Sequence, residues 1–131
     1  MVKKHLSDSM IRSGTALIQQ MDAHGLNPEA VFWLYDSDPD YRMWKLVIAM
    51  ADLDKIGRFE GYRRIRQIFA TLPVNEVGLE LDDITLVRPN EQPVPLLRRL
   101  VAPDRSPGGL HTINRPITGG MVEDSYVYRL A

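Results

Sequence analysis

The chain has no cysteine among its 131 residues. Disulfides, thiol nucleophiles and thiolate metal sites are therefore excluded. It also lacks a long apolar run, because the longest one, residues 46–51, is far too short to cross a bilayer. The basic residues at the N-terminus are followed by no apolar segment of signal-peptide length, so we expect a cytoplasmic protein that does not contact a membrane.

The chain also lacks an excess of charge of one sign, since its net charge is −1. This balance argues against a general nucleic-acid coat or a membrane-surface binder, both of which depend on net positive charge. The length predicts a single globular α+β domain over residues 1–131. A core of that size needs no metal to hold it together, and we expect no cofactor.

A β-hairpin is predicted over residues 31–50, which contain both tryptophans of the chain. Two β-branched and aromatic runs, 31–35 and 43–50, flank an acidic link rich in Asp, a pattern typical of two strands and a turn. Both faces of these strands are apolar. We therefore expect the hairpin at the centre of the fold, with its second face covered by the chain itself or by another molecule.

The acidic link has the opening spacing of an EF-hand calcium loop, with Asp36, Asp38 and Asp40. Tyr41 stands where that loop needs glycine, and Val47 stands where it needs a bidentate glutamate. The link is therefore predicted to be a turn, and no metal site is predicted.

Two long helices are predicted from apolar residues at helical spacing. Residues 6–23 form the first, with Ser7 as its N-cap and Gly25 as its left-handed C′ residue. Residues 58–72 form the second, which starts after Gly57. The buried stripe predicted for it consists of Phe59, Tyr62, Ile65, Ile68, Phe69 and Leu72.

The remaining elements are shorter. A third strand is predicted at 84–88, a short helix at 96–101, and two further strands at 110–113 and 121–130. The element order is α-β-β-α-β-α-β-β. It predicts an α+β fold with a single layer of mixed, mainly antiparallel sheet, about five strands, packed with two long helices and one short helix.

The second helix is locally basic from Lys55 to Arg66. Its candidate anion-binding or nucleic-acid-binding residues are Arg58, Arg63, Arg64 and Arg66. However, Glu60 lies three and four residues before two of these arginines, the spacing of ion pairs on an exposed helix face. No exposed aromatic is expected for base stacking, since Phe59 and Tyr62 are assigned to the buried stripe. A solvated helix face is the favoured interpretation.

No catalytic residue is predicted. His111 could meet Glu123 or Asp124 if the last two strands pair, but no nucleophile motif accompanies them. Converging carboxylates for metal-dependent phosphodiester chemistry cannot be assembled from the sequence either.

The sequence therefore favours a non-enzymatic protein-interaction or accessory module that forms a homodimer or binds a protein partner. Aromatic side chains anchor such interfaces, although each could equally belong to the core. The candidates are Trp33, Trp44, Tyr126 and Tyr128. The alternative is a nucleic-acid-binding or nucleic-acid-processing protein that uses the basic helix.

Overall fold

The computed structural model of the chain describes residues 6–38, 41–72, 79, 81–91, 94–100, 110–117 and 120–130. The elements in chain order are α1 (Asp8–Ala23), β1 (Ala30–Asp38), β2 (Tyr41–Ala49), α2 (Leu53–Phe69), the 3-10 helix η1 (Leu81–Asp83), β3 (Ile84–Val87), α3 (Val94–Leu100), β4 (Leu110–Ile117) and β5 (Gly120–Leu130). Apart from η1, this is the predicted order of helices and strands.

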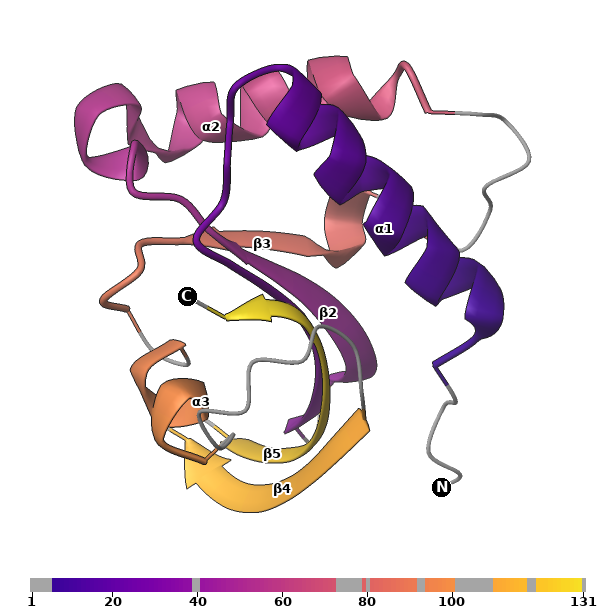
Figure 1. Cartoon of the computed structure of the whole chain (residues 1–131). Helices are drawn as coiled ribbons and strands as arrows, with labels where there is room; N and C mark the ends of the chain where they lie inside the picture. The colour runs from indigo at the N-terminus through magenta and orange to yellow at the C-terminus, as the bar shows by residue number, and fades with distance from the viewer. Residues whose placement is uncertain are drawn as a thin grey trace.

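The five strands form one sheet in the order β3-β2-β1-β5-β4 (Figure 1). β1 is antiparallel to both of its neighbours, and β4 is antiparallel to β5. Among the described strand pairs, only β2–β3 is parallel. A parallel pair needs a crossover connection, which α2 supplies. The predicted α+β fold with a mixed, mainly antiparallel sheet is confirmed, and the β1–β2 hairpin lies at its centre.

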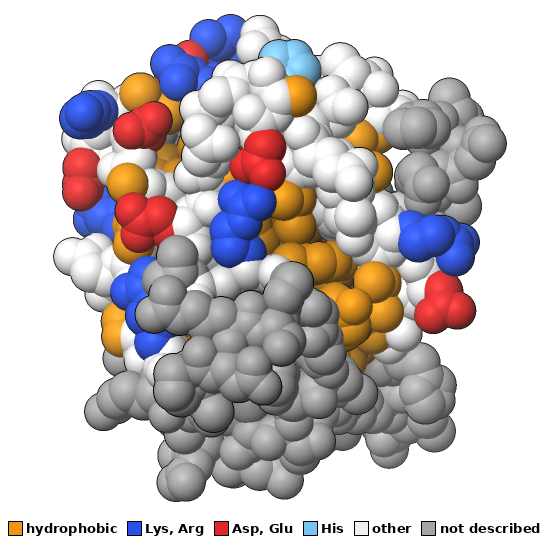
Figure 2. Space-filling view, in the orientation of Figure 1, with side chains coloured by type: hydrophobic (Ala, Val, Ile, Leu, Met, Phe, Trp, Pro, Cys, Tyr) orange, Lys and Arg blue, Asp and Glu red, His pale blue; other side chains and the backbone are white. Residues whose placement is uncertain are grey.

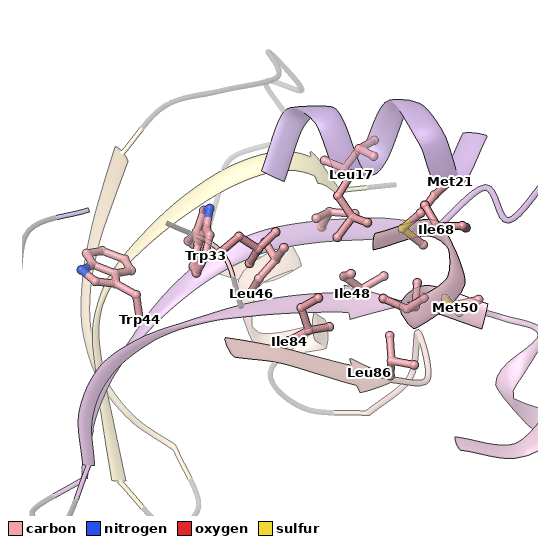
Figure 3. Close-up of a cluster of buried hydrophobic side chains, with 14 of the residues drawn as sticks. Leu17, Met21, Trp33, Trp44, Leu46, Ile48, Met50, Ile68, Ile84 and Leu86 are labelled. Atoms are coloured by element: carbon pink, nitrogen blue, oxygen red, sulfur yellow. The ribbon is translucent and has the colours of Figure 1, made fainter. Parts of the chain in front are cut away.

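Helices cover both faces of the sheet. Figure 1 shows α1 and α2 together on one side and α3 on the other. Figure 3 shows the first core, where Leu17 and Met21 of α1 and Ile68 of α2 meet the sheet. The second core contains Ala30, Phe32, Leu34, Val47, Ala49, Val87, Val94, Leu97 and Val127. The short helix α3 of this chain therefore covers the second apolar face of the hairpin.

Both ends of α1 follow the sequence prediction. Ser7 is the N-cap, and its hydroxyl accepts a hydrogen bond from the Met10 amide at 3.1 Å. At the C-terminus Gly25 adopts a φ of 77°, and the Leu26 amide donates to the Met21 carbonyl at 2.9 Å. This pattern is a Schellman motif, which only a residue tolerant of positive φ can close cheaply.

The predicted position of Phe59 in the buried stripe of α2 is wrong, because its side chain is 85% exposed. Gly57, with a φ of 81°, separates an extra turn from the main helix, and Leu53 of that turn enters the core instead. Gly61 makes room for it, since a Cβ there would lie 2.7 Å from Leu53. Phe59 lies about 120° around the helix from buried Ile65, so it points to solvent.

The hairpin strands are longer than predicted. The antiparallel ladder continues through Asp36 opposite Met43 to Asp38 opposite Tyr41, so residues 36–38 of the acidic link belong to β1. Pro39 and Asp40 lie outside the described residues. β4 likewise continues to Ile117 instead of ending at residue 113. Turn-forming residue types at the end of a strand predict a turn, whereas the ladder continues through them.

Candidate functional site

The two tryptophans among the predicted interface residues lie in the interior. Trp33 is 0% exposed and Trp44 is 5% exposed, both in the core beneath α1 and α2. Trp44 also makes an edge-to-face contact with Tyr35, whose ring centre is 5.3 Å away. Neither tryptophan is on the surface of the isolated chain, so core packing accounts for both.

The two tyrosines lie on β5 at the edge of that core. Tyr126 and Tyr128 are partly buried and contact each other edge to face, with ring centres 5.2 Å apart. The Tyr128 hydroxyl accepts a hydrogen bond from Trp33 Nε1 at 2.8 Å and donates one to the Ile11 carbonyl of α1 at 2.7 Å. Burial raises the pKa of Tyr128, so its proton stays in place as the donor. Tyr128 thus ties α1 to the sheet, while Tyr126 carries no such bond.

A surface groove of about 330 Å³ runs between α1 and β5. We call it the tyrosine groove, and its lining residues are Thr15, Ile18, Gln19, Asp22, Tyr126, Tyr128 and Arg129. Figure 2 shows hydrophobic side chains gathered along α1 on this face. The groove is therefore an apolar depression with polar residues at its rim, as binding surfaces commonly are.

One end of the tyrosine groove carries a two-pronged ion pair. Arg129 Nη2 donates to Asp22 Oδ2 at 2.7 Å and Nη1 donates to Oδ1 at 3.1 Å. Arg129 also donates to the Pro28 carbonyl at 3.0 Å. The hydrogen bonds from Arg129 lower the pKa of Asp22. Neither residue is predicted from the sequence as a site residue, because only the fold brings the end of α1 to the end of β5.

Three of the four candidate arginines of α2 have carboxylate partners. Arg58 pairs with Glu91, while Arg63 and Arg64 both pair with Glu60. Arg66 is exposed in the last turn of α2, and no described carboxylate pairs with it. The predicted pairing of Glu60 with the two arginines is confirmed. Because one carboxylate faces two guanidiniums there, the pairing compensates only one of their two positive charges.

Two of those arginines line a second groove, of about 430 Å³, between the end of α1 and α2. We call it the arginine groove, and its lining residues are His24, Leu26, Glu60, Arg63, Arg64, Gln67 and Ile68. The shortest hydrogen bonds to Glu60 come from Arg63, whose Nε donates to Oε2 at 2.7 Å and whose Nη2 donates to Oε1 at 2.5 Å. These bonds lower the pKa of Glu60 to about 2, so it stays charged at neutral pH.

The predicted meeting of His111 with an acid concerns side chains outside those that the structure describes. The backbone ladder places His111 opposite Ser125 and Thr112 opposite Asp124. Among the described residues no group of three His, Cys, Asp or Glu side chains could hold a metal ion. None of the described helices combines the length and the apolar character that a membrane span requires.

Comparison with known proteins gives no match: no family model, no curated protein and no solved structure is significantly similar to this chain.

Proposed function

We propose that this chain is a non-enzymatic protein-interaction module that forms a homodimer through the tyrosine groove. The observation that carries the proposal is the placement of Tyr126 and Tyr128 beside an apolar surface groove whose rim holds one acid and one base. Tyrosine and arginine are enriched among residues that dominate binding energy at interfaces. The groove combines both with an aliphatic floor supplied by Ile18.

A second copy of the chain is the occupant that the charges favour. A two-fold symmetric interface brings the same patch of both subunits together. Each contact between a residue of one copy and a residue of the other is therefore repeated with the two copies exchanged. Asp22 and Arg129 each have 36% of their side chain exposed, so both can reach a partner. In such a pair each copy offers an acid to the other's base, whereas a patch of one sign would repel itself.

The alternative, nucleic-acid binding through α2, has less support. A nucleic-acid surface needs cations that are available to phosphate groups. Arg58, Arg63 and Arg64 instead have glutamate partners in this chain. Phe59 is exposed on α2 and could stack on a base, but a single exposed aromatic is common on protein surfaces.

Sedimentation equilibrium tests the homodimer. We expect the apparent mass of the wild-type chain to rise with concentration from 14.9 kDa towards twice that value. Tyr126→Ala should hold the mass at the monomer value, because it removes an interface ring that makes no hydrogen bond tying α1 to the sheet.

The matched control is Phe59→Ala, which removes an equally large ring that is 85% exposed and lies outside the groove. It should dimerise like the wild type. A wild-type chain that stays monomeric at every concentration would refute the proposal. Equal loss of the dimer in both variants would place the contact elsewhere.

A further inference from the structure

The arginine groove has the size and the lining of a small-molecule site. Its volume of about 430 Å³ lies within the range of ligand pockets. Leu26 and Ile68 supply an apolar wall, and His24, Gln67 and the two arginines supply polar groups. The polar groups come from two different elements. His24 caps the C-terminus of α1, whereas Gln67 and the two arginines lie on α2.

The groove holds hydrogen-bond donors that the described part of the chain does not use. A guanidinium carries five N–H donors in a planar fork. Arg64 donates to Glu60 Oε1 through Nε at 3.2 Å, and its two terminal nitrogens have no acceptor among the described residues. The Gln67 side chain lies one helical turn further along the same wall. Two parallel N–H groups on one guanidinium match the two oxygens of a carboxylate.

The charge of the lining selects the class of ligand. Two guanidiniums face one carboxylate, so the groove keeps one positive charge in excess. One excess charge suits a monoanion, because a dianion such as a phosphate monoester would leave a net negative charge in the groove. The apolar wall suits a hydrocarbon or aromatic body.

We propose that the arginine groove binds a small amphipathic carboxylate, with its carboxylate on the terminal nitrogens of Arg64 and its apolar body against Leu26 and Ile68. Glu60 competes with this ligand, since it accepts two hydrogen bonds from Arg63 and one from Arg64. This site is separate from the tyrosine groove, and its test does not depend on dimerisation.

A titration of the ¹⁵N-labelled chain with octanoate, followed by NMR, tests the site. We expect the amide signals of Leu26, Arg64 and Gln67 to shift and to saturate. Octanol, which lacks the charge, and inorganic phosphate, which lacks the apolar body, should each shift them much less. Saturation of the same signals by octanol would show a hydrophobic surface that does not recognise the carboxylate. Saturation by phosphate would show an anion site that does not need the apolar body. Either result overturns the proposal.

Three variants assign the contacts. Arg64→Ala should weaken octanoate binding by at least about tenfold, because it removes the two charge-assisted hydrogen bonds to the carboxylate. Glu60→Gln should strengthen it, because the competing negative charge is gone. Arg66→Ala removes an exposed arginine outside the groove and should change nothing.

All three positions are partly or fully exposed, so the variants should fold, and an unchanged amide spectrum checks this. Absence of saturable octanoate binding in the wild type would overturn the proposal. An equal loss in Arg64→Ala and Arg66→Ala would also overturn it, because non-specific attraction to positive charge would then explain the binding.

Discussion

The contact between Gly14 and Tyr128 gives the sharpest prediction about stability. Gly14 lies in α1 directly under the tyrosine, and a Cβ at this position would lie 2.3 Å from the Tyr128 hydroxyl oxygen and 2.7 Å from Cζ. Gly14→Ala therefore forces either the ring or the helix to move. The ring cannot move freely, because its hydroxyl joins Trp33 Nε1 to the Ile11 carbonyl.

Three contributions set the magnitude of this effect. Alanine is a better helix former than glycine by about 1 kcal/mol, which favours the variant. Overpacking a well-packed contact costs about 1–3 kcal/mol. Moving the hydroxyl leaves the N–H of fully buried Trp33 without its acceptor, at a cost of about 1–3 kcal/mol. The unfavourable contributions win, and we expect a net loss of about 3 kcal/mol in the free energy of unfolding.

Urea denaturation of four chains measures this effect: the wild type, Gly14→Ala, Tyr128→Phe and the double variant. Tyr128→Phe should itself cost about 1–3 kcal/mol, because Trp33 loses its acceptor. In the double variant the nearest clashing atom is gone, so Gly14→Ala should cost less there than in the wild type. A Gly14→Ala chain that is more stable than the wild type would refute the reasoning, since helix propensity would then outweigh the contact.

Three further predictions concern single interactions. The pKa of Asp22 is lowered in the folded chain, so its ion pair with Arg129 stabilises the fold above the unfolded value of 3.8. That stabilisation is lost as the pH falls through the folded pKa. In Arg129→Gln the free energy of unfolding should therefore fall less between neutral and acid pH than in the wild type. The difference should be less than about 1 kcal/mol, because solvent screens this pair. Ser13 is fully buried and its hydroxyl finds no described partner, so Ser13→Ala should leave the thermal midpoint unchanged or raise it. Tyr62→Phe should lower the free energy of unfolding by about 1–3 kcal/mol, since the Tyr62 hydroxyl accepts the Leu86 amide at 3.0 Å; an unchanged urea midpoint would contradict this.

Local features of the fold could be predicted because their causes lie within a few residues. Ser7 and Gly25 determine the two ends of α1 through bonds that span three to five residues. The element order followed from hydrophobic spacing in the same way. The extra turn before Gly57 could not be predicted from the period of the stripe, because a single positive φ resets the helix and moves Leu53 into the core.

The candidate sites depend on contacts that the sequence separates widely. Trp33 and Tyr128 are 95 residues apart, and Asp22 and Arg129 are 107 apart. Residue type alone therefore predicts four aromatic side chains as interface anchors. Only the pairing of β5 with β1 shows that two of them, Tyr126 and Tyr128, reach the surface beside α1. One signal was present in the sequence: Gly14 interrupts an apolar helix stripe, which indicates a close neighbour.

The most direct test of self-association through the tyrosine groove is an isotope-filtered NOE measurement on a mixture of labelled and unlabelled chains. The filter passes only contacts between different copies. Our proposal predicts cross-peaks from the Tyr126 ring of one copy to the Ile18 methyl groups of the other. Their absence at concentrations where the chain is dimeric, or filtered cross-peaks confined to α2, would contradict it.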